Sequence, residues 1–233
     1  GLLAALKISQ LNLRVTCIEN QTHEKYHNNI QDDNRSTAVL MPGIEFLQEL
    51  GLWTDIKAYS EPLKKMRLID AGGKSNEIQY LADFDSNEIK QSQFGFNVPN
   101  HLLKEKMVNH LENYKNSTIK YNQSISRIIT RSSNAVTIFG DQTQISSKLI
   151  IGADGRDSFL RENQKIKKKK WSYDQMALAF VVHHELPHKN VSIVIHRSKG
   201  PFTLVPLPSE GKINRSAVVW MDKTDVIERL NKL

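Results

Sequence analysis

The segment KLIIGADGRDSFLR, residues 148–161, decides the fold. Its apolar residues Leu149 to Ile151 predict the end of a buried strand, and Gly-Ala-Asp-Gly follows at once. Glycine permits positive φ angles and a close approach of the backbone to another group. Asp154, between the two glycines, is therefore placed where a carboxylate can meet a ligand. An Asp-Gly turn that binds nothing has the same sequence and remains the alternative.

The composition is that of a globular protein with a sizeable core, because 39% of the 233 residues are hydrophobic and 24% are charged. No apolar run approaches the roughly 20 residues that a membrane-spanning helix needs. The single cysteine, Cys17, excludes a disulfide framework and fits a reducing compartment, so we expect a cytoplasmic protein. The eight histidines show no metal-ligand spacing, and we predict no metal site.

The formal net charge of +7 is concentrated in the run KIKKKK at 165–170. Such a run is typical of a solvated loop. Only Trp171 lies beside it, without the interleaved aromatic residues of a nucleic-acid surface, so we predict no nucleic-acid partner. Attraction to an anionic membrane surface is the alternative that stays open.

The beginning of the chain has the pattern of the second half of a dinucleotide-binding βαβ unit. A helix predicted from Leu2 to Leu11 opens after Gly1, and the strand LRVTCIE ends at Glu19. In that unit a glycine lets helix and strand pack closely, and an acidic residue at the end of the next strand accepts hydrogen bonds from ribose hydroxyls. An ordinary helix–strand pair with a surface glutamate is the alternative.

The rest of the chain predicts alternating elements. We expect a polar loop over 20–34, a short helix from Pro42 that ends near Gly51, and a helix that starts at Pro99–Asn100. Strands are predicted over the following segments: parts of 61–96, 118–130, 135–139, MALAFVVHHEL, VSIVIHR, FTLVPLP and SAVVWMD.

This order predicts an α/β (α+β) fold in which a Rossmann-like βαβ domain is interleaved with a mainly antiparallel β domain. The predicted nucleotide domain comprises residues 1–60 and 97–165, and the predicted β-rich substrate domain comprises 61–96 and 171–233.

Four motifs occur in an informative order. Arg35 precedes a helix ending in Leu-Gly-Leu-Trp, and FGFNVPNHLLKEKM leads a strand into a helix. Gly-Ala-Asp-Gly-x-x-Ser-x-x-Arg follows at 152–161, and then GPFTLVPLP. Together they resemble the FAD-dependent aromatic monooxygenases of the para-hydroxybenzoate hydroxylase type, and most closely the branch of ubiquinone-biosynthesis hydroxylases.

The resemblance implies a set of FAD-binding positions: Gly1, Glu19, Arg35, Asn100, Asp154 and Gly155. Glu19 would hold the adenosine ribose, and Arg35 would place positive charge near the pyrophosphate. Asp154 would serve the site shared by the pyrophosphate and the nicotinamide nucleotide. Asn100, with His101 as the alternative, would approach the cofactor from the start of its helix. No catalytic residue is assigned.

The resemblance also implies a function. With FAD and NAD(P)H as cofactors, such an enzyme hydroxylates an aromatic ring, here an aromatic small molecule of the polyprenyl-phenol class in ubiquinone biosynthesis. Peripheral association with the inner face of the membrane, or with other enzymes, is expected. We further expect the chain to be an internal fragment of a longer monooxygenase that binds FAD poorly in isolation. A same-fold flavin reductase without oxygenation and a basic, non-enzymatic membrane-surface module remain alternatives.

Overall fold

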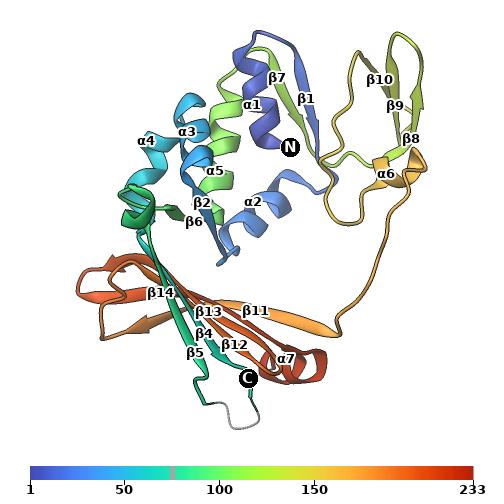
Figure 1. Ribbon diagram of the computed structural model, residues 1–233. Coiled ribbons are helices and arrows are strands. Elements are labelled where there is room, and N and C mark those ends of the chain that lie inside the picture. Colours follow the sequence, from blue (N-terminus) through green and yellow to red (C-terminus); the bar gives the residue numbers. More distant parts are fainter. Residues whose placement is uncertain (74–76, 233) are drawn as a thin grey trace. The chain divides into compact units, whose positions relative to one another are not determined.

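The computed structural model describes residues 1–73 and 77–232, which form two compact units (Figure 1). The first unit comprises Gly1–Ile30 and Met107–Trp171, and the second comprises Gln31–Lys106 and Ser172–Leu233. Each unit therefore consists of two separate stretches of chain, as expected for interleaved domains. The division places residues 31–60 and 97–106 in the second unit, whereas the predicted nucleotide domain includes them. The domain boundaries stay a prediction.

The first unit contains the predicted helix and strand at the start of the chain. Helix α1 (Leu2–Gln10) packs on strand β1 (Val15–Ile18), which pairs in parallel with β7 (Ser117–Lys120). The short connection between α1 and β1 makes them run in opposite directions. The start of α1 therefore lies at the end of the sheet where β1 and β7 finish. Buried apolar side chains of the unit include Ala5, Leu6, Val108, Leu111 and Phe139.

The remaining elements of this unit are two helices and a small sheet. An antiparallel sheet has the strand order β10 (Gln144–Ser147), β9 (Ala135–Phe139), β8 (Ile125–Thr130). The helices are α2 (His23–Gln31) and the five-residue α6 (Phe159–Asn163). Helix α5 (Asn100–Glu112) begins in the second unit and enters the first at Met107.

The prediction of a loop over 20–34 was wrong, because α2 occupies most of that stretch. The Thr22 hydroxyl accepts a hydrogen bond from the Lys25 amide and starts the helix. Tyr26 and Ile30, four residues apart, lie on one face, and Ile30 is buried. The helix is polar in composition, so too few aliphatic residues mark its buried face for the helical period to be recognised.

The buried strand end predicted at Leu149–Ile151 was also wrong. These residues form no strand, and Leu149 is 72% exposed. Within the described residues β1 pairs only with β7, so the segment that follows β10 adds no strand to that parallel sheet. Three consecutive apolar residues predict burial only if a neighbouring strand is present to cover them.

The second unit contains a six-stranded sheet in the order β11-β14-β13-β12-β4-β5. All neighbouring pairs are antiparallel except β12 and β4, so the sheet is mainly antiparallel as predicted. The bounds are β4 (Lys65–Ala71), β5 (Tyr80–Asp85), β11 (Gln175–His184), β12 (Val191–Arg197), β13 (Gly200–Glu210) and β14 (Ile213–Lys223). Helix α7 (Thr224–Leu230) contacts β11 and β14.

A smaller antiparallel sheet of this unit has the order β2 (Ser36–Leu40), β6 (Gly95–Pro99), β3 (Glu61–Leu63). The buried Asn97 amide donates a 2.8 Å hydrogen bond to the Pro206 carbonyl and joins β6 to β13. The other elements are α3 (Met41–Glu49), α4 (Trp53–Ile56), η1 (Lys57–Tyr59) and η2 (Ser86–Ile89). Pro42 lies in the first turn of α3 and Gly51 follows its end with φ 75°, as predicted.

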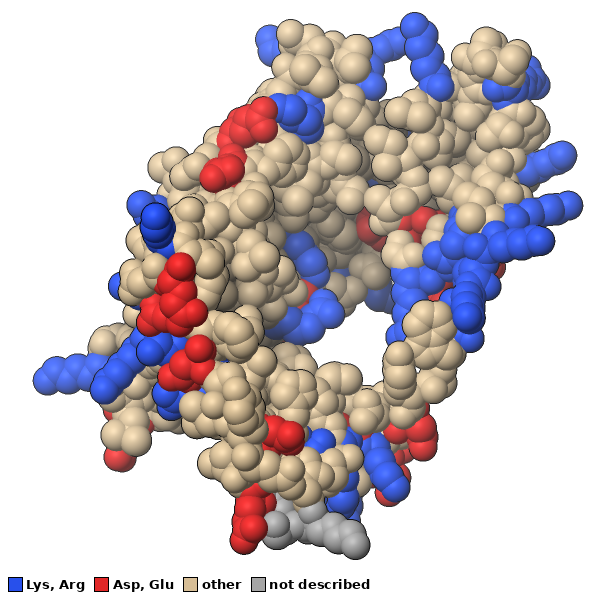
Figure 2. Space-filling model, viewed as in Figure 1, with Lys and Arg blue, Asp and Glu red and all other residues tan. Residues whose placement is uncertain are grey.

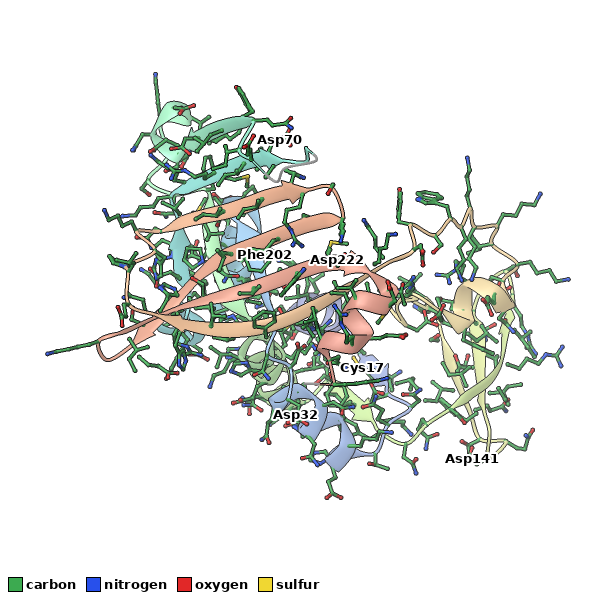
Figure 3. The ribbon with its side chains drawn as sticks, turned by 90° about the horizontal axis from the view of Figure 1, so that it is seen from below. Cys17, Asp32, Asp70, Asp141, Phe202 and Asp222 are labelled. Atoms are coloured by element: carbon green, nitrogen blue, oxygen red, sulfur yellow. The ribbon has the colours of Figure 1, made fainter. Side chains whose placement is uncertain are left out.

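An aromatic and cationic cluster joins the interior strands β12, β13 and β14 of the large sheet, where Figure 3 labels Phe202 and Asp222. The Phe202 and Trp220 rings pack edge to face with centroids 5.7 Å apart. The Arg197 guanidinium lies 5.4 Å from the Trp220 ring centroid and 3.7 Å from the buried Asp222 carboxylate. The charge of Asp222 is thus paired. No helix in the described part of the chain is both long and apolar enough to cross a membrane.

Candidate functional site

Gly1 and the Gly-Ala-Asp-Gly loop, which are far apart in the sequence, meet in the first unit. A Cβ atom added to Gly1 would lie 3.4 Å from the Cβ of Ala153. Gly1 is the N-cap of α1, and no side chain caps this helix end. The free amide groups of the first helical turn and the loop therefore lie together, an arrangement that suits an anionic group such as a phosphate.

Asp154 is bonded within its own loop. Its Oδ1 accepts a 2.6 Å hydrogen bond from the Ser158 hydroxyl, and its Oδ2 accepts a 3.0 Å bond from the Leu160 amide. Burial alone would raise the pKa of Asp154, but these hydrogen bonds outweigh burial and lower it. Ser158 in turn accepts from the Arg161 amide as N-cap of α6. Asp154 thus fixes the path of the loop into α6.

Gly152 and Gly155 are each required in the loop, but for different physical reasons. A Cβ on Gly152 would approach the Leu160 side chain to 2.5 Å, so Gly152 allows the loop to pack against α6. Gly155 has φ +82° with open space around it, so its reason is the backbone angle. The exposed backbone at Gly155 is therefore free for a ligand to approach.

Glu19 follows β1 and lies at the same end of the sheet as the start of α1. Its Oε1 accepts a 3.0 Å hydrogen bond from the Gln21 amide, which fixes the turn after the strand. Its charge helps to raise the pKa of Tyr26, after the larger effect of burial. Glu19 therefore lies near an aromatic group that the sequence analysis did not identify.

That group is a cluster of four rings: His23, Tyr26, His27 and Tyr121. Their centroids lie between 4.2 Å and 6.1 Å apart. His27 Nε2 and the Tyr121 hydroxyl are buried and have no hydrogen-bond partner among the described residues. Burial, followed by the charge of Glu112, raises the pKa of Tyr121 to about 12. Tyr121 thus stays a neutral hydroxyl and can donate to a ligand.

Arg35 and Asn100 lie together in the second unit. The Asn100 backbone N–H donates a 2.9 Å hydrogen bond to the Arg35 backbone carbonyl, and the Thr37 hydroxyl donates to the side-chain oxygen Oδ1 of Asn100 at 2.7 Å. These bonds continue the pairing of β2 with β6. The position of Asn100 at the start of α5 is as predicted.

The Asp33 carboxylate fixes the Arg35 side chain by an ion pair. The Arg35 guanidinium donates from Nε and Nη2 to the two carboxylate oxygens at 2.7 Å and 2.9 Å. Lys104 Nζ lies 2.5 Å from Oδ2 of the same carboxylate. Hydrogen bonds from Arg35, with further help from Lys104, hold the pKa of Asp33 well below its ordinary range. The Asp33 side chain is 4% exposed and that of Arg35 63%, so the group presents a net positive charge.

The predicted positions therefore fall into two sets. Gly1, Asp154 and Gly155 lie together, and Glu19 lies at the same end of the parallel sheet, all in the first unit. Arg35 and Asn100 lie together in the second unit. The sequence analysis missed four residues of these sets: Tyr26, Tyr121, Asp33 and Lys104. Each is recognised only in the structure, from its contacts or from the burial of the residue that it contacts.

Comparison with known proteins assigns a family. The sequence model of a protein family described as the FAD binding domain matches residues 1–229. The chain belongs to this family. This match, together with the relatives and the solved structure described next, confirms the predicted resemblance to flavoprotein monooxygenases and the α/β fold class. The uncapped start of α1 and the buried Tyr121 hydroxyl, which has no hydrogen-bond partner among the described residues, are features that an FAD-binding domain can use.

Among curated proteins, the FAD-binding domain is similar to the ubiquinone hydroxylase UbiL of Rhodospirillum rubrum, with 26% identity over 85% of this chain and 44% of the relative. It is 24% identical to the 3-demethoxyubiquinol 3-hydroxylase of Escherichia coli over 98% of this chain and 56% of that protein. The chain thus spans about half the length of these curated relatives. The p-nitrophenol 4-monooxygenase PnpA of Pseudomonas putida shares the fold, with a TM-score of 0.76 at 17% identity over 98% of this chain and 58% of that one.

Proposed function

We propose that this chain forms the FAD-binding part of an NAD(P)H-using monooxygenase that hydroxylates an aromatic ring. The observation that carries the proposal is the contact between Gly1 and the Gly-Ala-Asp-Gly loop at the end of the sheet that also holds Glu19. Ligands of α/β sheets bind at the carboxyl ends of parallel strands, and a helix start and an acidic residue there suit a dinucleotide.

The residues of the first unit would bind the adenosine half of FAD. Glu19 would accept hydrogen bonds from the ribose hydroxyls, and Tyr121 could donate to a polar atom of the same half. The amides of the first turn of α1 and the open backbone at Gly155 would receive the pyrophosphate. Both oxygens of Asp154 are already bonded, so we expect Asp154 to keep the loop in shape rather than to bind the phosphates itself.

The residues of the second unit would add positive charge. Arg35 is held at Nε and Nη2 by Asp33, which leaves Nη1 and the exposed side of the guanidinium for a phosphate oxygen. Fixing the side chain in advance lowers the entropy lost on binding. Asn100, whose Oδ1 is occupied by Thr37, would offer its amide NH₂ group to the cofactor.

The substrate class is proposed from the names of the relatives. Two of them are hydroxylases of ubiquinone or demethoxyubiquinol, so we propose a polyprenyl phenol as substrate. FAD, when bound, would supply the chemistry that passes electrons from NAD(P)H to dioxygen. A cytoplasmic location with peripheral attachment to the membrane fits a substrate with a prenyl tail.

The first test is the affinity for FAD, measured by flavin fluorescence for this chain and for the longest natural polypeptide that contains it. Glu19→Gln removes the charge but keeps an acceptor for the Gln21 amide, and we expect about tenfold weaker binding, or about 1.4 kcal/mol. Glu24→Gln, an exposed change on α2, is the matched control and should leave the affinity unchanged. No flavin binding by either polypeptide would overturn the proposal.

The second test separates oxygenation from simple reduction. The flavin-loaded protein is given NAD(P)H, a phenol and ¹⁸O-labelled dioxygen. A hydroxylated product carrying ¹⁸O supports the monooxygenase. NAD(P)H oxidation with a reduced substrate and no oxygen incorporation would instead identify a same-fold flavin reductase.

A further inference from the structure

A surface of the first unit carries most of the net charge of the molecule. Between Lys148 and Trp171 the chain has eight Lys or Arg residues and three Asp or Glu residues, a net charge of +5 out of +7. Figure 2 shows Lys and Arg gathered over the region of α6 and the segment that follows it. We call this the lysine surface: Arg156, Arg161, Lys165 and Lys167 to Trp171.

Five cations of the lysine surface face a common space. Arg156, Arg161 and Lys168 to Lys170 line one open hollow of about 310 Å³ together with Asp157 and Trp171. Lys168 pairs with Glu162 at 3.0 Å. The side chains of Lys165, Lys167, Lys169 and Lys170 form no hydrogen bond or ion pair with another described residue. Four ammonium groups are thus left to a partner from outside the unit.

Exposed apolar side chains accompany these cations. Trp171 closes the run of lysines and is 62% exposed, and Ile166 within it is 60% exposed. A second open hollow is lined by Leu160 of α6 together with Ile166, Leu149, Lys148 and Arg131. Aliphatic and tryptophan side chains among solvated lysines gain free energy when they enter the boundary between lipid headgroups and acyl chains.

We propose that the lysine surface binds an anionic lipid bilayer. A polybasic segment is attracted by the negative potential of such a membrane, while Trp171, Ile166 and Leu149 enter its interface. A nucleic acid fits the surface less well, because only one aromatic side chain is present for base stacking and the exposed Ile and Leu side chains gain nothing from a phosphate backbone. The lysine surface would thus provide the membrane attachment that the proposed function includes, and the proposal rests on the proposed function for that attachment.

The experiment is sedimentation of the purified chain with phosphatidylcholine vesicles, with and without about one third phosphatidylglycerol. We expect binding to the anionic vesicles only, and a loss of binding as salt is added. Lys167→Gln, Lys169→Gln and Lys170→Gln, combined, should lower the partition coefficient by about a hundredfold, at about fivefold per lysine. The same three positions changed to Arg should keep the affinity.

A matched control neutralises three exposed lysines of the second unit, Lys64, Lys199 and Lys212, and should leave binding within about threefold. Equal binding by the neutralised lysine surface, or equal binding to neutral vesicles, would overturn the inference. So would a single-stranded oligonucleotide that binds the chain more tightly than anionic vesicles do.

Insertion is tested with brominated lipids, which quench nearby tryptophan. Trp53 is buried and Trp220 is half-buried, so Trp171 should account for most of the quenching and Trp171→Phe should remove it. Unchanged quenching in Trp171→Phe would refute the proposed orientation. FAD affinity is measured in parallel for every variant and should not change, so a failure of membrane binding and a failure of the proposed function give different results.

Discussion

At the scale of single residues, the buried Asp33 carboxylate is the charge whose removal has the clearest consequence. It is 4% exposed and neutralised by Arg35 and Lys104. Losing one partner of a largely buried ion pair leaves the other charges uncompensated. Since both cations keep access to water, we expect Asp33→Asn to lower the free energy of unfolding by about 2 kcal/mol at pH 7. Urea denaturation measures this.

Asp33 also predicts a pH dependence. Its pKa is lowered in the folded state, so below the ordinary Asp value of about 4 the unfolded chain binds more protons than the folded one. The stabilisation by Asp33 is therefore complete above that pH and is lost as the solution is acidified through the folded-state pKa. Asp33→Asn should flatten the stability profile below about pH 4.

Asp32→Asn is the control, because it makes the same chemical change at the preceding residue, which is exposed; Figure 3 labels Asp32. It should leave both the stability and the acid profile as they are. An acid profile for Asp33→Asn that matches the unmodified chain would contradict the assigned role.

At the scale of elements, the five-residue helix α6 depends on its start. Asp154 and Ser158 cap it through a chain of hydrogen bonds that ends at the Arg161 amide. We expect Ser158→Ala and Asp154→Asn each to cost about 1 kcal/mol, as losses of helix caps do. Because the two side chains bond each other, the double variant should cost about 0.5 to 1 kcal/mol less than the sum.

Thermal and urea unfolding of the two single variants and the double variant measure this coupling. Ser132→Ala, in an exposed turn of the same unit, should change nothing. Additive losses would mean that the Asp154–Ser158 bond contributes no coupling.

The elements also show what the sequence predicts well. Helices α1, α3 and α5 were predicted because Leu2 to Leu11, Pro42 with Gly51, and Pro99–Asn100 give local signals of start, face and end. Helix α2 was missed because Ile30 is its one buried residue, and the half-buried Tyr26 and His27 are covered only by a distant ring, Tyr121. Local sequence signals likewise led to the prediction of Gly1, Glu19 and Asp154, which belong to motifs. No local signal marks Asp33 and Lys104, because their contact joins positions 71 residues apart.

At the scale of the whole molecule, two compact units in one chain predict two unfolding events. Among the described residues, the parallel sheet of the first unit has two strands and the large sheet of the second has six. Two-stranded sheets contribute little stability of their own, so we expect the first unit to unfold at the lower urea concentration.

Two probes separate these events. Cys17 lies on β1, and burial raises the pKa of its thiol, so it should react slowly with a thiol reagent until the first unit opens. In a Trp171→Phe background, the fluorescence of Trp53 and Trp220 reports on the second unit alone. Coincident transitions by the two probes would show that the units unfold together.

The pairing of β1 with β7 has a consequence for how the chain is made. Val15 lies opposite Ser117, so β1 cannot pair with β7 until about a hundred further residues have left the ribosome. At about 5 to 20 residues per second, the segment from α1 to β1 waits roughly 5 to 20 seconds for β7. During that time its apolar residues are exposed, and a chaperone that covers nascent chains would protect the part of the molecule that contains Gly1 and Glu19 of the proposed FAD site.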